Sequence, residues 1–114
     1  MKKMKGLIIR DPHISEILDG RKTWEMRSQK TKIRGRIGLI KGGSGCVYGE
    51  ADLVDVLDPL ETDLDIEKSW EKHRVDDFSL LKKWRYPWKL ENVEIYEKPI
   101  PYNHPSGAVI WVNL

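Results

Sequence analysis

The segment Gly20–Ser28 carries the charged side chains that are the first candidates for chemistry, because Lys22, Glu25 and Arg27 lie close together around a tryptophan. A carboxylate between two cations can remain ionised at neutral pH and accept hydrogen bonds from a base amino group. Arginine can hold a phosphate with two parallel N–H groups, and lysine can hold it as a point charge. The segment therefore predicts an anion- and base-binding site or, alternatively, a surface ion-pair ladder contributing less than about 1 kcal/mol.

A short helix is expected directly before this segment. Asp11 and Pro12 are typical of a helix start, and Gly20 is typical of the residue that follows a helix. Between them, three Ile and Leu side chains fall on one helical face. A chain that turns at Gly20 would place Lys22 at the entrance to the next element.

Residues 23–27 alternate in polarity, which predicts a strand. Trp24 and Met26 would face one side, and Glu25 and Arg27 would face the other together with the hydroxyl of Thr23. The pattern thus places the carboxylate and the guanidinium side by side on one strand face.

The remaining chain predicts a small α+β fold, a mostly antiparallel β-barrel with two or three short helices. Strands are expected at residues 7–9, 23–27, 37–40, 46–57, 88–96 and 108–112. Further helices are expected at residues 66–73 and 76–84, the latter capped by Asp76 or Asp77. A bulge is expected at Gly49, and residues 99–105 are expected to form an ordered loop because they contain three prolines.

Length and composition predict one cytoplasmic domain spanning residues 1–114. The chain has 39% hydrophobic and 33% charged residues, as expected of a globular protein. No apolar run is long enough to cross a membrane, and the basic start is followed by too short an apolar stretch for a signal peptide. Cys46 is the only cysteine, which favours a reducing compartment.

The small net charge of +2 conceals a strong asymmetry along the chain. Residues 1–50 hold 12 Lys or Arg and 5 Asp or Glu, whereas residues 51–114 hold 8 and 13. Clustered positive charge attracts nucleic-acid phosphates, so the first half favours a nucleic-acid partner. Two alternatives remain open: the acidic half can neutralise the basic half in the fold, or it can bind a protein partner.

Several motifs resemble those of one known family. The pattern Gly20-x-Lys22-x-x-Glu25-x-Arg27 resembles the G-x-K-x-x-E-x-R signature of the ASCH domain, which belongs to the PUA-like superfamily. Residues 10–13, 34–38 and 86–93 resemble the family's opening, its second strand region and its tryptophan-containing strand, so the resemblance covers most of the chain.

The resemblance implies a PUA-like barrel with a cleft beside the motif that binds RNA or a modified nucleotide, without a cofactor. Lys22, Glu25 and Arg27 match the polar positions of the motif. Around them we expect a phosphate rim and a base-stacking edge. The further candidate binding residues are Arg21, Ser28, Arg34, Arg36, His13 and Trp88.

An amidohydrolase acting on an acylated nucleoside is the second hypothesis. Some small bacterial ASCH proteins hydrolyse N4-acetylcytidine with a lysine, a threonine and an acidic residue. Lys22 matches the lysine, but Glu25 occupies the threonine position, and Thr23 does not match by position. The acid would be Glu71 or Asp77. Because the hydroxyl is replaced, we place binding ahead of hydrolysis, although Glu25 could activate water while Lys22 stabilises negative charge.

Other kinds of site have weaker support. His13, His73 and His104 are distant in sequence and no cysteine pair accompanies them, so no metal site is expected. The glycines at residues 42–45 lack phosphate-loop spacing and predict a hairpin turn. A third functional class, a protein–protein adaptor, would be favoured if side chains filled the cleft.

Overall fold

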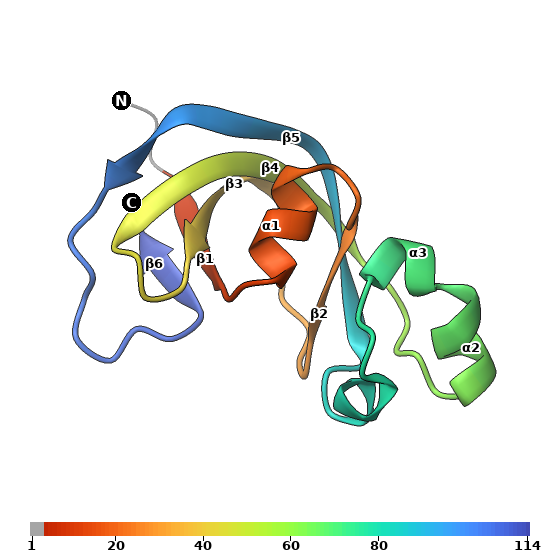
Figure 1. The fold of residues 1–114 in the computed structure, drawn as a ribbon. Helices are drawn as coiled ribbons and strands as arrows, with labels where there is room; N and C mark the ends of the chain where they lie inside the picture. The colour runs from red at the N-terminus through yellow and green to blue at the C-terminus, as the bar shows by residue number, and fades with distance from the viewer. Residues whose placement is uncertain (1–3) are drawn as a thin grey trace.

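A computed structural model describes residues 4–114, and residues 1–3 of the basic start lie outside this range. The described chain forms one six-stranded sheet in the order β2-β5-β4-β3-β1-β6 (Figure 1). The strands are β1 (Lys5–Ile9), β2 (Trp24–Arg27), β3 (Gly35–Lys41), β4 (Cys46–Val56), β5 (Tyr86–Pro101) and β6 (Trp111–Asn113). The helices are α1 (His13–Leu18), α2 (Asp63–Lys68), α3 (Trp70–His73) and the 3-10 helix η1 (Phe78–Lys82).

The sheet curls into a half-barrel around α1, which confirms the predicted α+β class (Figure 1). The β1–β3 pair is parallel, and the other pairs are antiparallel. The strand register shifts next to Gly49, where a bulge was predicted. A side chain at this glycine would overlap the Glu94 carbonyl, so the close approach of β4 and β5 requires glycine.

The main hydrophobic core fills the curl of the sheet. Ile14 and Ile17 of α1 are 1% and 0% exposed, and they pack against buried Leu and Ile side chains of the strands. Burying each such side chain contributes about 1.5–3 kcal/mol. Gly20 has φ +80°, in the left-handed region, and the chain turns there from α1 toward β2. The helix predicted before the charged segment is therefore confirmed.

A helical segment between β4 and β5, formed by α2, α3 and η1, packs against β2 through a second core. This core contains the buried side chains of Met26, Ile66, Val75 and Leu81. Thr62 begins α2 with a capping box, in which its hydroxyl accepts from Asp65 N at 3.0 Å and its backbone N donates to the Asp65 carboxylate at 3.3 Å. No helix among residues 4–114 is long and apolar enough to cross a membrane.

Several element boundaries differ from the predictions. The helix predicted at residues 66–73 is two short helices that meet at Ser69, whose hydroxyl bonds to the Asp65 carbonyl. The segment 76–84 forms only a 3-10 turn, begun by Asp77, which accepts from Ser79 N at 3.1 Å. Strand β5 continues to Pro101 because its outer half still pairs with β4, and β6 begins only at Trp111.

His73 is the polar centre of the helical segment and is 0% exposed. Val75 N donates to His73 Nδ1 at 2.9 Å, so this nitrogen carries no proton, and Nε2 lies 2.8 Å from the Ile66 carbonyl, to which it donates. Burial lowers the pKa of His73, and the Lys22 charge lowers it further. The ring must be neutral for both bonds to form.

We expect the protein to lose stability in mild acid. Because the folded-state pKa of His73 lies below the unfolded value of 6.5, the unfolded chain binds more protons as pH falls through 6.5, and unfolding becomes easier. His73→Asn, whose amide oxygen can replace Nδ1, should reduce this pH dependence in urea titrations between pH 7 and pH 5. The exposed-site control His104→Asn should retain it, and equal slopes for both variants would contradict the assignment.

Candidate functional site

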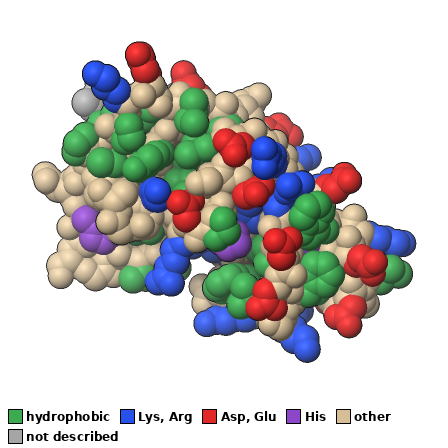
Figure 2. Space-filling model, viewed as in Figure 1, with side chains coloured by type: hydrophobic (Ala, Val, Ile, Leu, Met, Phe, Trp, Pro, Cys, Tyr) green, Lys and Arg blue, Asp and Glu red, His purple; other side chains and the backbone are tan. Residues whose placement is uncertain are grey.

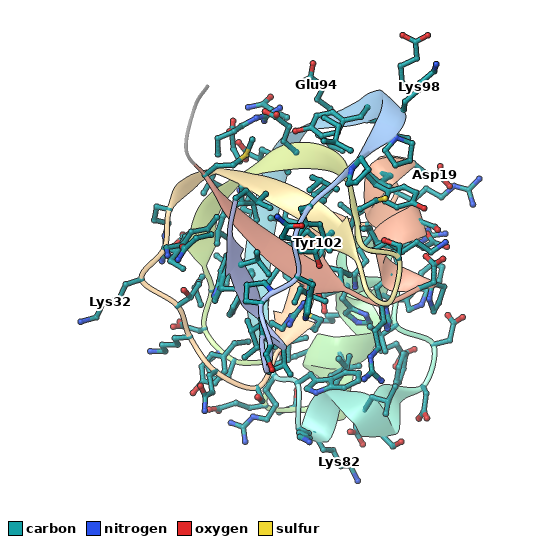
Figure 3. All side chains as sticks on the ribbon, turned by 90° about the vertical axis from the view of Figure 1, so that its left-hand side faces the viewer. Asp19, Lys32, Lys82, Glu94, Lys98 and Tyr102 are labelled. Atoms are coloured by element: carbon teal, nitrogen blue, oxygen red, sulfur yellow. The ribbon has the colours of Figure 1, made fainter. Side chains whose placement is uncertain are left out.

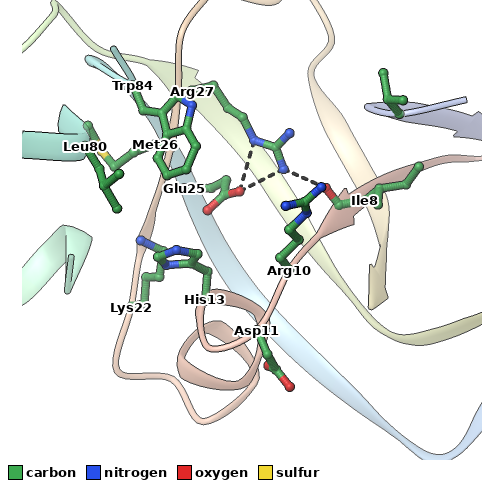
Figure 4. Close-up of a pocket in the computed structure, with 11 residues that line it drawn as sticks. Ile8, Arg10, Asp11, His13, Lys22, Glu25, Met26, Arg27, Leu80 and Trp84 are labelled. Atoms are coloured by element: carbon green, nitrogen blue, oxygen red, sulfur yellow. Dashed lines mark hydrogen bonds and ion pairs between the residues drawn. The ribbon is translucent and has the colours of Figure 1, made fainter. Parts of the chain in front are cut away.

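A pocket of about 450 Å³ opens where the end of β1, the start of α1, strand β2 and the helical segment meet (Figure 4). A notch between the body of the sheet and the helical segment is visible on the surface (Figure 2). The lining residues are Ile8, Arg10, Asp11, His13, Lys22, Glu25, Met26, Arg27, Leu80, Trp84 and Val109. The pocket therefore gathers Lys22, Glu25, Arg27 and His13 from the predicted site.

Glu25 and Arg27 form a partly buried ion pair on β2, on the face that the alternation predicted. Arg27 Nη2 and Nε lie 2.8 and 3.0 Å from Glu25 Oε2. The same Nη2 donates to the Ile8 carbonyl of β1 at 2.7 Å. Arg27 is thus occupied by protein acceptors at two of its nitrogens, and it positions the carboxylate.

The second carboxylate oxygen of Glu25 is left open to the pocket. Glu25 is only 5% exposed, yet among residues 4–114 no group donates a hydrogen bond to Oε1. Among the described residues, Oε1 is not one of the fully buried atoms without a partner, so this oxygen is in contact with solvent. Figure 4 shows this oxygen pointing toward Lys22 and His13. A largely buried carboxylate with one oxygen that lacks a hydrogen-bond partner is suited to accept from an N–H group of a ligand.

Lys22 is the most unusual group in the pocket because it is a lysine with 1% exposure. Its ammonium donates to the His73 carbonyl of α3. Burial lowers the pKa of Lys22 to about 8, although the nearby Glu25 carboxylate partly offsets this effect. At neutral pH the side chain is still mostly protonated, so it offers the pocket a cation with donors to spare.

His13, the first residue of α1, lines the pocket close to Lys22 (Figure 4). Burial lowers the pKa of its ring, partly offset by the charge of Glu25. Its ring packs edge-on against Trp84 with centroids 6.5 Å apart. Among residues 4–114 neither ring nitrogen of His13 has a hydrogen-bond partner, so the neutral ring can both donate to and accept from a ligand.

Sequence reasoning missed two parts of the pocket: the cation Arg10 at its rim and the apolar wall that includes Trp84. Arg10 is exposed at the pocket rim, directly after the buried strand β1, and its position after that strand was the available signal. Trp84 was interpreted as a packing residue, but it lines the pocket together with Met26, Leu80 and Val109. Residues from opposite ends of the chain form this wall, so no local pattern could reveal it.

Arg36 lies outside this pocket, contrary to its prediction as a rim residue. Its guanidinium contacts the carboxylates of Glu50 at 2.7 Å, Asp52 at 3.2 Å and Glu94 at 3.5 Å. It also donates to the Asn92 carbonyl at 2.6 Å. Two of these carboxylates come from the acidic half, which therefore folds back on the basic half at this point.

Trp88 also lies outside the pocket, because the curl of the sheet turns it into the main core. It is 3% exposed and stacks on Trp111 with centroids 5.8 Å apart. Its indole N–H donates to the Gln29 carbonyl at 2.9 Å. The edge of the pocket is formed by Trp84 instead, so the expectation of stacking on Trp88 is not met by its position.

The other predicted residues are exposed and do not line the pocket. Thr23 lies at the edge of β2, where its backbone N donates to Lys72 O at 3.0 Å. Asp77 uses its carboxylate to cap η1. The remaining residues of this group are Arg21, Ser28, Arg34 and Glu71. Among residues 4–114 no group of three or more His, Cys, Asp or Glu side chains is placed to hold a metal ion.

Because of Lys22, the free energy of unfolding should rise with pH in the alkaline range. Its pKa is about 8 in the folded state and 10.5 in the reference state, so the unfolded chain binds more protons between these values and stability rises through that window. The rise is on the order of 3 kcal/mol. Urea titrations should show it for wild type and for the exposed-site control Lys98→Met, but not for Lys22→Met. Parallel curves for all three proteins would show that Lys22 titrates normally.

Comparisons with known structures identify the fold. The crystal structure of ASCH from Zymomonas mobilis superposes with a TM-score of 0.69 at 14% identity, covering 86% of this chain and 73% of that chain. Two mutant forms of that protein give TM-scores of 0.64 at 15% identity and 0.69 at 13% identity. They cover 88% and 97% of this chain, and 76% and 87% of theirs.

At these identities the likeness establishes the architecture alone. A search of curated proteins found no match. The family model of the ASCH domain matches residues 7–104, which is most of the chain and includes the charged motif. The predicted resemblance is therefore confirmed, and the protein belongs to the ASCH domain family, with its PUA-like fold.

Proposed function

We propose that the pocket binds a base of RNA or a nucleotide, with Glu25 and Lys22 reading the edge of the base. The observation that carries this proposal is the open Oε1 of Glu25, held beside the Lys22 ammonium in a hollow. A volume of about 450 Å³ falls within the range of small-ligand pockets. A buried acceptor next to a buried donor matches a base edge, where amino or imino hydrogens lie beside carbonyl or ring-nitrogen acceptors.

The three cations of the pocket, Arg27, Lys22 and Arg10, have different roles in this proposal. Arg27 fixes the carboxylate, because its N–H groups bond to Glu25 Oε2 and to the Ile8 carbonyl. Lys22 donates to a base acceptor from the floor of the pocket. Arg10 stands exposed at the rim, where it can contact the phosphate of the bound nucleotide.

The apolar wall gives the base a surface to pack against. Trp84 and the ring of His13 meet edge-on, with Met26 buried beside them. Contact between a base and an aromatic side chain contributes about 1–3 kcal/mol. A cleft filled by side chains would have favoured the adaptor hypothesis, and the hollow does not supply that observation.

Binding should depend on both buried groups. We expect Glu25→Gln and Lys22→Met each to weaken nucleotide binding roughly 10- to 100-fold, since each removes a hydrogen bond to a charged group. Fluorescence anisotropy with labelled single-stranded RNA and calorimetry with nucleoside monophosphates would measure the loss, with Lys98→Met as an exposed-site control. Wild-type binding should also weaken above pH 8, where Lys22 loses its proton. Full affinity in both pocket variants would overturn the proposal.

A second candidate function is amide hydrolysis of an acylated nucleoside, and the observation favouring it is the lowered pKa of Lys22 beside a carboxylate. In this reaction Glu25 Oε1 removes a proton from water as the water oxygen bonds to the amide carbon. Lys22 stabilises the resulting oxyanion, Glu25 returns the proton to the leaving nitrogen, and the C–N bond breaks to give a carboxylic acid and a free amine. Because Glu25 occupies the position of the threonine hydroxyl in the hydrolytic motif, we rank hydrolysis second.

Incubation of the protein with N4-acetylcytidine separates the two functions. Hydrolysis predicts release of cytidine by wild type, with a loss of at least about 100-fold in Glu25→Gln, since general-base catalysis contributes 10²–10⁴. Chromatography of the nucleosides gives the measurement. If the nucleoside binds and is returned unchanged, binding alone is the function.

A further inference from the structure

The basic loop, residues 28–34, joins the candidate pocket to a second hollow. It starts directly after Arg27, which bonds to Ile8 O at the pocket, and it ends at β3. The second hollow, of about 710 Å³, is open and lies at the other end of β1. It is lined by Met4, Lys5, Ile33, Arg34, Arg36, Ile37, Asn113 and Leu114. The loop and β1 therefore both span the distance between the two hollows.

Contacts with the main core hold the basic loop in place. The Trp88 indole donates to Gln29 O at 2.9 Å, and Ile33 packs against the main core. Arg34 Nη1 donates to the carbonyls of Thr31 and Ile33, each at 2.8 Å, which closes the end of the loop. These contacts preform the loop, so a ligand would bind it without paying the full entropy of ordering.

The charged side chains of the basic loop are all cations, because residues 28–34 contain no Asp or Glu. Lys30 and Lys32 are exposed, and Figure 3 shows Lys32 pointing away from the body of the protein. Arg34 has only a long contact with Asp55, at 3.9 Å and with both side chains well exposed. In the hollow, the Lys5 ammonium donates to the neutral amide oxygen of Asn113 at 2.8 Å, which is not a carboxylate. Arg36, by contrast, is held by close contacts with the carboxylates of Glu50 and Asp52.

The spacing of these cations suits successive phosphates. Lys30 follows Arg27 by three residues, so their Cα atoms lie within about 11 Å, and Lys5 lies about 10 Å along β1 from Ile8. A single-stranded nucleic acid with one base in the pocket would therefore bring its neighbouring phosphates to the basic loop. We propose that the basic loop and the second hollow bind the backbone of a single-stranded polynucleotide whose one base occupies the pocket. This inference rests on the proposed function and makes its ligand a polymer.

The test compares an oligonucleotide with mononucleotides. A labelled single-stranded RNA about eight nucleotides long is titrated over a salt series against wild type, Lys30→Ser/Lys32→Ser and the control Lys82→Ser/Lys98→Ser, which removes equal charge elsewhere. Each lost phosphate contact reduces the slope of log K against log salt by about 0.7, so the loop variant should lose about 1.4. Its affinity for nucleoside monophosphates should stay at the wild-type value, and the control should match wild type.

The outcomes separate this inference from the proposed function. If mononucleotides bind through Glu25 while the oligonucleotide binds no tighter or the loop variant keeps its slope, the inference fails and the proposed function stands. If neither ligand binds wild type, both fail. If the loop variant has a reduced slope while Glu25→Gln binds normally, the loop contacts phosphates but Glu25 reads no base, and both the inference as stated and the proposed function fail. A DNA version of the oligonucleotide identifies the sugar preference. Equal displacement of the RNA by polyglutamate would assign the basic loop and the second hollow to an acidic protein and overturn the inference.

Discussion

The guanidinium of Arg27 is the constraint on which the pocket depends, because it joins two strands that are not neighbours. Strands β2 and β1 are separated in the sheet by β5, β4 and β3, and only the curl of the sheet brings their ends together. Arg27 closes the remaining gap with one bond to Ile8 O on β1 and a pair of bonds to Glu25 on its own strand. The carboxylate is therefore fixed by the global curvature of the fold, which explains how a short motif can mark a complete site.

Lys22 connects the same pocket to the helical segment. Its ammonium bonds to the His73 carbonyl, and the His73 ring in turn satisfies Ile66 and Val75 within that segment. A lysine with 1% exposure costs stability, as its lowered pKa shows. Proteins often tolerate such a cost where a charged group must face a ligand rather than water. The buried position of Lys22 is thus more easily understood from binding than from folding.

Much of the frame could be predicted from local patterns, whereas the completed pocket could not. Alternation placed Glu25 and Arg27 on one face of β2 correctly, because period-two burial is a property of a strand itself. Trp88 and Arg36 were misplaced because the curl of the sheet and the folding-back of the acidic strands decide their surroundings. Arg10 and Trp84 were missed for a related reason: the fold decides which side chains line the pocket, and it brings Trp84 to a motif that ends 57 positions earlier in the chain. Tertiary geometry, rather than propensity, assigned these four side chains.

The placement of the helical segment has an evolutionary consequence. It is inserted between two adjacent strands, β4 and β5, and it supplies Leu80 and Trp84 while the sheet and α1 supply the polar floor. Such an insertion can change in length or composition, for example through a shuffled or grafted connection, while the floor stays intact. If the pocket binds the base that we propose, exchange of this helical segment would alter the apolar wall while Lys22 and Glu25 stay in place.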